Sequence, residues 1–132
     1  MPFNYSDDYC FACGKKNPIG LKLDVKTSDG KAWAEFVPRK EFEGYHGYLH
    51  GGIIATLLDE IMVYAAHTVR IPSLTAELTV RYKKPALIGS RLLIEGKVVQ
   101  NRGRLIRTEG TIKNEEGDII ATARATYMQV SG

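Results

Sequence analysis

One long helical pattern constrains the fold of this chain more than any other feature. It spans residues 51–68, and at 100° per residue its apolar stripe comprises Ile54, Leu57, Leu58, Ile61 and Ala65. The other periodic segments alternate as strands do, two before the helix at 21–25 and 31–37, and four after it at 76–82, 92–99, 105–113 and 119–130. This order predicts an α+β domain in which one long central helix is wrapped by a curved, mostly antiparallel sheet.

Length and composition indicate the class of protein. The 132 residues suit one domain, 1–132, whose first part, 1–19, is irregular because cysteine, glycine and proline interrupt it. A formal charge of +3 is too small for a nucleic-acid-binding surface, although it suits a small anionic ligand. The sequence has no run of about eighteen apolar residues, and residues 1–8 do not resemble a signal peptide. We therefore expect a cytoplasmic protein with reduced cysteines.

The start of the predicted helix combines features of an oxyanion site. Its first N–H groups lack intrahelical partners, and the side-chain-free Gly51 and Gly52 let a ligand approach the backbone closely. Asp59 and Glu60 follow inside the same apolar helix, where a carboxylate costs free energy unless it has a use. The segment therefore predicts an anion or carbonyl site beside an acid or base.

Three separated motifs carry a family resemblance. His50-Gly51-Gly52 precedes Asp59, which lies nine residues after the histidine, and a second motif begins at Thr75 in Thr-Ala-Glu-Leu-Thr-Val-Arg-Tyr-Lys-Lys-Pro-Ala. The third is Cys-Phe-Ala-Cys-Gly-Lys-Lys-Asn-Pro-Ile-Gly-Leu at 10–21. Over almost the whole chain, the sequence resembles the hotdog-fold thioesterases, in the branch related to phenylacetate-degradation acyl-CoA thioesterases. The resemblance implies the hotdog fold.

The resemblance also implies hydrolysis of acyl-CoA without a metal or a bound cofactor. By motif position, Asp59 would be the nucleophile or the base that activates water, and the Gly51 N–H would polarise the thioester carbonyl. The family implies a homodimer with sites at the subunit interface, often paired into a tetramer, in which the partner subunit's Thr75 would orient water. Some members have an asparagine six residues before the histidine, where this chain has Gly44. That role is vacant here, or another loop residue fills it.

Basic residues at two strand ends are candidates to contact CoA phosphates, which Arg and Lys bind well. In related enzymes the nucleotide lies over the segments that match 82–86 and 101–105. The predicted substrate-binding residues are Gly52, Tyr82, Lys83, Lys84, Asn101, Arg102, Gly103 and Arg104. The alternative for any one of the basic side chains is a solvated surface position.

The remaining histidines and cysteines have no sequence pattern of a metal site. Cys10 and Cys13 form a lone CxxC pair without the second pair of a zinc ribbon, and we expect a turn packed near the active site. His46 and His50 are four residues apart, but no third ligand accompanies them. His50 stands at the predicted helix cap, where its ring would cap the helix or fix the loop, and it is also a candidate catalytic residue beside Asp59, Gly51 and Thr75. We therefore expect no metal.

Glu60 is not expected to share a substrate atom with Asp59, because it lies about 100° further round the helix. The alternative to a direct catalytic role for Glu60 is a polar contact at the helix edge, with His67 or an arginine. The acyl group is not determined by the sequence, although Phe42, Tyr45 and Tyr48 are candidates to line an aryl or medium-chain pocket.

Two other functions compete with hydrolysis. The first is a non-catalytic acyl-CoA-binding module, which would have no need of a mid-helix acid such as Asp59. The second is a hotdog hydratase or dehydratase, which pairs a histidine with an acid in a way that this sequence does not show.

Overall fold

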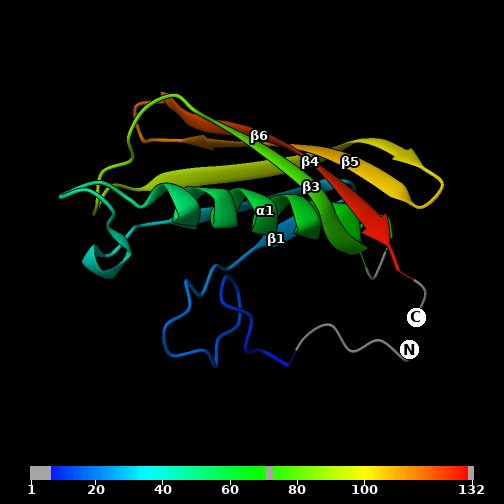
Figure 1. Cartoon of the computed structure of the whole chain (residues 1–132), viewed down its shortest axis with the longest axis horizontal. Coiled ribbons are helices and arrows are strands. Elements are labelled where there is room, and N and C mark those ends of the chain that lie inside the picture. The colour runs from blue at the N-terminus through cyan, green and yellow to red at the C-terminus, as the bar shows by residue number, and fades with distance from the viewer. Residues whose placement is uncertain (1–6, 71–72, 131–132) are drawn as a thin grey trace.

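The computed structural model describes residues 7–70 and 73–130. Within these ranges one α-helix, α1 (Gly51–His67), lies across the inner face of a single curved sheet, as Figure 1 shows. The strands are β1 (Lys26–Ser28), β2 (Lys31–Phe36), β3 (Ser73–Tyr82), β4 (Leu92–Arg102), β5 (Leu105–Lys113) and β6 (Ile119–Gln129), and a short 3-10 turn, η1, covers Lys40–Phe42. The sheet order is β1-β2-β4-β5-β6-β3, and every neighbouring pair is antiparallel. The predicted α+β architecture is confirmed.

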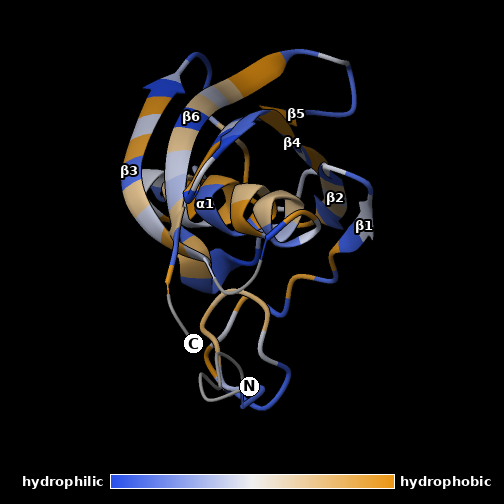
Figure 2. Cartoon of the chain, turned by 90° about the vertical axis from the view of Figure 1, so that its right-hand side faces the viewer, coloured by the Kyte–Doolittle hydropathy of each residue, from blue (hydrophilic) through white to orange (hydrophobic). Residues whose placement is uncertain are grey.

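The core lies between α1 and the sheet. All five side chains of the predicted helical stripe are buried, and Figure 2 shows hydrophobic residues on the helix where the sheet wraps around it. Gly96 of β4 pairs with Gly110 of β5 beneath α1. A Cβ on Gly96 would lie 3.1 Å from Ile61 Cγ2, and one on Gly110 would lie 3.1 Å from Met62 Cγ. Glycine at both positions lets the helix pack closely on the sheet.

The predicted strand at 21–25 is wrong. Leu21 and Leu23 are buried, as their alternation indicates, but Lys22 between them has a φ of 54°, which no strand residue adopts. The N–H groups of both leucines bond to carbonyls of the N-terminal loop, at 2.8 and 2.9 Å, instead of to a strand of the sheet. The first strand, β1, begins only at Lys26.

The other predicted boundaries differ by a few residues. Helix α1 ends at His67, one residue earlier than predicted, and β3 and β4 are each three residues longer than their sequence patterns. The hairpin between β4 and β5 turns at Gly103, whose φ of 60° suits glycine. Residues 1–6 of the predicted irregular extension and the predicted break at 71–72 lie outside the described residues. Among those described, no helix is long and apolar enough to cross a membrane.

Candidate active site

The start of α1 presents an unpaired backbone N–H group. His50 caps the helix, and its Nδ1 accepts a hydrogen bond from the Gly52 N–H at 2.9 Å, so the predicted cap is confirmed. Gly51 is exposed, and its N–H has no acceptor in the part of the chain that is described. Its carbonyl accepts a hydrogen bond of 2.7 Å from the Tyr82 hydroxyl, which ties the helix start to the end of β3. The Gly51 N–H can therefore bind an oxygen of a ligand.

The loop before the helix packs tightly around the cap. A Cβ on Gly44 would lie only 3.1 Å from His50 Cα, so this position supports the cap residue and offers no side chain to a carbonyl. The three loop aromatics do not form one pocket. Phe42 is buried with its ring centroid 6.2 Å from that of Phe36, whereas Tyr45 is 87% exposed.

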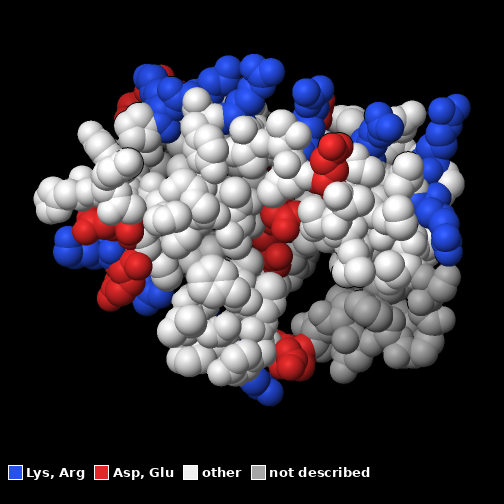
Figure 3. Space-filling model, in the orientation of Figure 1, with Lys and Arg blue, Asp and Glu red and all other residues white. Residues whose placement is uncertain are grey.

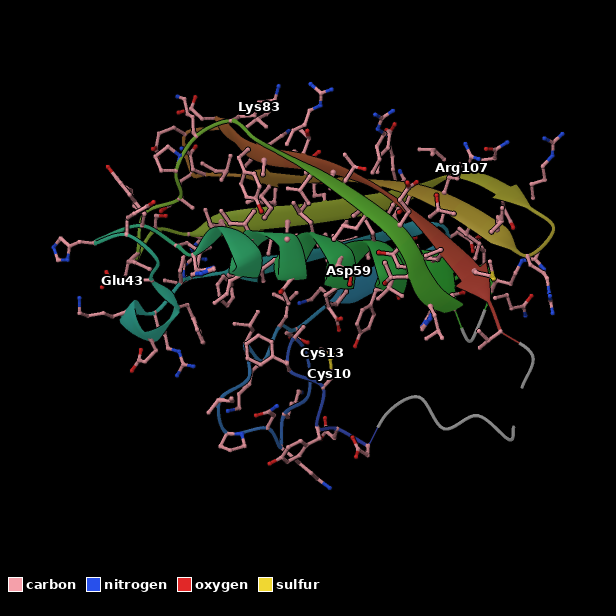
Figure 4. All side chains as sticks on the ribbon, viewed as in Figure 1. Cys10, Cys13, Glu43, Asp59, Lys83 and Arg107 are labelled. Carbon is pink, nitrogen blue, oxygen red and sulfur yellow. The ribbon has the colours of Figure 1, made fainter. Side chains whose placement is uncertain are left out.

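Asp59 of α1 is held by two hydroxyl groups from the sheet, one on β3 and one on β6. Its Oδ1 accepts hydrogen bonds from Thr75 Oγ1 at 3.0 Å and from the Tyr127 hydroxyl at 2.8 Å. The Tyr127 hydroxyl also lies 2.9 Å from the Asp59 backbone carbonyl. No group in the described ranges bonds to Oδ2. The carboxylate is therefore fixed through one oxygen, and the other is available for chemistry, in the position that Figure 4 labels between α1 and β3.

Thr75 lies on the same chain as the Asp59 that it contacts. The expectation that Thr75 reaches the site from a partner subunit is therefore wrong. The reason is the register of the sheet, because β3 pairs with β6 so that Thr75 lies opposite Tyr127, directly beside α1.

Tyr127 was missed by the sequence reasoning. Its side chain is fully buried, and burial, together with the charge of Asp59, raises its pKa far above the ordinary value. The phenol therefore stays protonated and donates to the carboxylate. A signal was present in the sequence: the inward positions of β6 are Ala121, Ala123, Ala125 and Tyr127, three small residues followed by one large polar one.

Glu60 contacts the N-terminal loop, whereas Asp59 contacts β3 and β6, in agreement with the prediction that the two acids lie about 100° apart round the helix. Its Oε2 lies 3.8 Å from Cys10 Sγ in the N-terminal loop. Burial raises the pKa of the Glu60 carboxyl, with a further rise from the charge of Asp59 and an opposing effect of the hydrogen bond from Cys13. The predicted alternative contact of Glu60 with His67 is wrong, because His67 Nε2 instead accepts from the Ser73 N–H at 3.2 Å.

The two candidate catalytic groups, the Gly51 N–H and the Asp59 carboxylate, lie far apart within one chain. Gly51 and Asp59 are eight residues apart on α1, which corresponds to about 12 Å along the helix axis. A thioester carbonyl bound at the Gly51 N–H is out of reach of the same chain's Asp59.

The two predicted CoA-binding groups, 82–84 and 101–104, also lie at opposite ends of the sheet. Ala121 of β6 pairs with the end of β3 beside the first group, whereas Met128 pairs with Leu105 beside the second. These β6 residues are seven positions apart, or about 23 Å along a strand. Figure 3 shows Lys and Arg spread along the sheet side of this face, with acidic side chains near its middle. The structure does not bring the two groups together in one chain.

Comparison with known proteins identifies a family. Residues 46–121 match the model of the Thioesterase superfamily. A putative esterase of Saccharolobus solfataricus is 35% identical over 86% of this chain and 84% of its own length. Acyl-coenzyme A thioesterase 13 of Homo sapiens is 30% identical over 82% of this chain and 79% of its own. Acyl-coenzyme A thioesterase THEM4 of Xenopus laevis is 34% identical over 72% of this chain, which spans only 43% of that relative.

Solved structures share the same fold. A thioesterase superfamily protein of known crystal structure superposes with a TM-score of 0.85 and 25% identity, over 92% of this chain and 61% of that one. The E. coli PaaI protein from the phenylacetic acid degradation operon superposes with a TM-score of 0.80 and 19% identity, over 85% of this chain and 82% of its own. The predicted hotdog fold with PaaI-like relatives is confirmed.

Proposed function

The chain belongs to the thioesterase superfamily, and on this premise we propose that it is an acyl-CoA thioesterase, which hydrolyses a thioester to a free carboxylic acid and CoA. The observation that carries the proposal is the Asp59 carboxylate, held through Oδ1 by two hydroxyl donors with Oδ2 left free. The names of the human and Xenopus relatives support acyl-CoA as the substrate class. A cytoplasmic location stays a prediction.

In the proposed reaction, the Gly51 N–H donates to the thioester carbonyl oxygen and stabilises the negative charge that develops there. Asp59 Oδ2 either takes a proton from the attacking water or attacks the carbonyl carbon itself, in which case water then cleaves the mixed anhydride. The carbon–sulfur bond breaks in both versions, and the CoA thiolate leaves and takes up a proton. Thr75 and Tyr127 keep the carboxylate in its reactive orientation.

We further infer that each site is shared between two copies of the chain. Because Gly51 and Asp59 of one chain are about 12 Å apart along the helix, one carbonyl can meet both groups only if they come from different chains. A two-fold dimer that places the Gly51 of one chain opposite the Asp59 of the other forms two equal sites. The same exchange brings residues 82–84 of one chain toward residues 101–104 of its partner.

The edge strand β3 is the proposed dimer contact. It is ten residues long, it ends the sheet beside β6, and most of its residues are exposed. Such an edge offers unpaired backbone groups to a second copy, and Leu74 and Tyr82 on it are 49% and 54% exposed. Pairing of dimers into a tetramer stays a prediction.

The activity is tested by release of thiol from a panel of aryl, short-chain and medium-chain CoA esters. We expect catalytic release, with many turnovers per chain, from at least one ester class. If the purified protein binds acyl-CoA in a one-to-one ratio and releases no thiol from any of them, it is a binding module and the proposed hydrolysis is wrong.

The contact with CoA phosphates is tested by the salt dependence of KM. Exposed contacts of Lys83 with phosphate are screened by salt, so KM for a CoA ester should rise several-fold between about 0.05 and 0.5 M ionic strength. Lys83→Ala should raise KM more than it lowers kcat, because the contact forms equally in the ground and transition states. The control is Lys31→Ala on β2, which is the second strand from the opposite edge of the sheet. Equal effects of the two variants would show that Lys83 has no special contact with the nucleotide.

A further inference from the structure

The N-terminal loop places two thiols and a carboxylate together beneath α1. Cys10, Cys13 and Glu60 each offer one ligand atom, and these three atoms lie within 4.8 Å of one another. Figure 4 shows the two cysteines side by side below α1, on the side of the helix away from the sheet. The sequence reasoning found no metal site because no second cysteine pair is present, but the fold supplies the third group from the helix.

Local backbone structure holds the two thiols in place. The Gly14 N–H bonds to the Cys10 carbonyl at 2.8 Å, which closes the loop into a tight turn around the CxxC pair. A Cβ at Gly14 would overlap the Cys10 backbone nitrogen, so this turn requires glycine. The loop is anchored between the cysteines, because the Leu21 and Leu23 N–H groups bond to the carbonyls of residues 11 and 12. The cluster is therefore built by the protein before any ligand arrives.

The charge of the cluster suits a cation. Each of the three groups carries negative charge once it is deprotonated, and none of the salt bridges found in the described ranges reaches Glu60. Burial raises the pKa of the Cys13 thiol and of the Glu60 carboxyl, so a cation that binds here must displace their protons. Cys10 is exposed, while Cys13 and Glu60 are half-buried, so an ion can enter from solvent. Cys-x-x-Cys is the spacing of one half of many zinc sites, and thiolate and carboxylate are both zinc ligands.

The distances suit zinc after a small contraction. Two sulfur ligands of a tetrahedral zinc ion lie about 3.8 Å apart, at a zinc–sulfur bond length of about 2.3 Å. The separations of up to 4.8 Å in the cluster must therefore shorten by about 1 Å at most. Rotation of the exposed Cys10 side chain and small shifts of the half-buried Cys13 and Glu60 side chains provide a change of that size.

We propose that Cys10, Cys13 and Glu60 form a zinc site, with two thiolates and one carboxylate oxygen as protein ligands and water in the fourth position. On binding, each thiol gives up its proton to solvent. The ion would fasten the N-terminal loop to α1, one residue from Asp59. This site does not depend on the proposed hydrolysis.

The proposal is tested by titrating the metal-free, fully reduced chain with Zn²⁺ against a chromophoric chelator. We expect one zinc ion per chain, and Co²⁺ in its place should show a thiolate-to-metal charge-transfer band. Cys13→Ser should weaken zinc binding by about a hundredfold or more, and Glu60→Gln by about tenfold or more. Glu41→Gln, an exposed acid in η1 far from the cluster, is the control and should leave the affinity unchanged.

A second test, thermal unfolding, does not require the zinc affinity of a variant to be measured. Saturating zinc should raise the Tm of the wild type by about 5–10 °C at a hundredfold excess over Kd, and should leave the Tm of Cys13→Ser unchanged. If Cys13→Ser does not fold, Cys10→Ser and the cobalt spectrum of the wild type decide the matter. The proposal is overturned if the reduced wild type takes up no zinc at micromolar concentrations, or if the serine variants bind zinc as tightly as the wild type. It is also overturned if the two cysteines form a disulfide and the reduced chain leaves zinc unbound.

Discussion

Asp59→Asn should lower kcat by about a thousandfold or more, which is a loss of about 4 kcal/mol of transition-state stabilisation. The amide oxygen of asparagine can still accept the hydrogen bonds from Thr75 and Tyr127 that now reach Oδ1. The fold and the substrate affinity should therefore stay near those of the wild type. What the variant loses is a group that can attack the thioester or take a proton from water. The measurement is steady-state thiol release, with circular dichroism as the check on folding.

Two further variants define the specificity of this effect. Glu60→Gln should cost far less activity, because its carboxylate faces Cys10 and not the Asp59 site. The kcat of Tyr127→Phe should lie between those of Glu60→Gln and Asp59→Asn. The variant removes one of the two hydrogen-bond donors to Asp59 and leaves the other, Thr75, in place. A Glu60→Gln variant more damaged than Asp59→Asn would contradict the assignment of the acid.

The helix and five of the strands, β2 to β6, could be predicted because side-chain periodicity indicates which face is buried. Ile54, Leu57 and Ile61 recur at helical spacing and are buried beneath the sheet. The segment at 21–25 shows where this reasoning fails, because its leucines alternate and are buried, yet their N–H groups bond to a loop ten residues earlier. Periodicity therefore predicts which side chains are buried, but it does not predict which backbone groups form hydrogen bonds with each other.

The candidate site also has parts that the sequence predicts and parts that it does not. The helix cap at His50 and the acid at Asp59 were predicted from spacing along one helix, which is a local property. The position of Thr75 and the contribution of Tyr127 depend on the register between β3 and β6, which sequence spacing does not give. The Glu60 cluster depends on the path of the N-terminal loop beneath α1, which is equally non-local.

Gly51→Pro isolates the contribution of one backbone N–H group. Gly51 is the first residue of α1, where proline is well tolerated, and the ψ of 134° at His50 is the value that a residue before proline prefers. The variant therefore removes the N–H and keeps the helix. Loss of one donor to the developing oxyanion should lower kcat by about 100- to 1,000-fold. The control Gly51→Ala keeps the N–H, and its Cβ would meet the Tyr82 ring at an ordinary 3.6 Å, so its activity should stay near that of the wild type.

Mixing Gly51→Pro with Asp59→Asn tests whether the two groups meet across a dimer. If each site takes Gly51 from one chain and Asp59 from the other, one site of each mixed dimer carries both substitutions and the second site carries neither. Random exchange after joint unfolding and refolding makes about half of the dimers mixed, so activity should recover to about a quarter of the wild-type value. If Gly51 and Asp59 of the same chain acted together, every site would carry one lesion and mixing would restore nothing. The 12 Å between them on one helix leads us to expect the recovery, and its failure in a sample shown to contain mixed dimers would rule out the shared site.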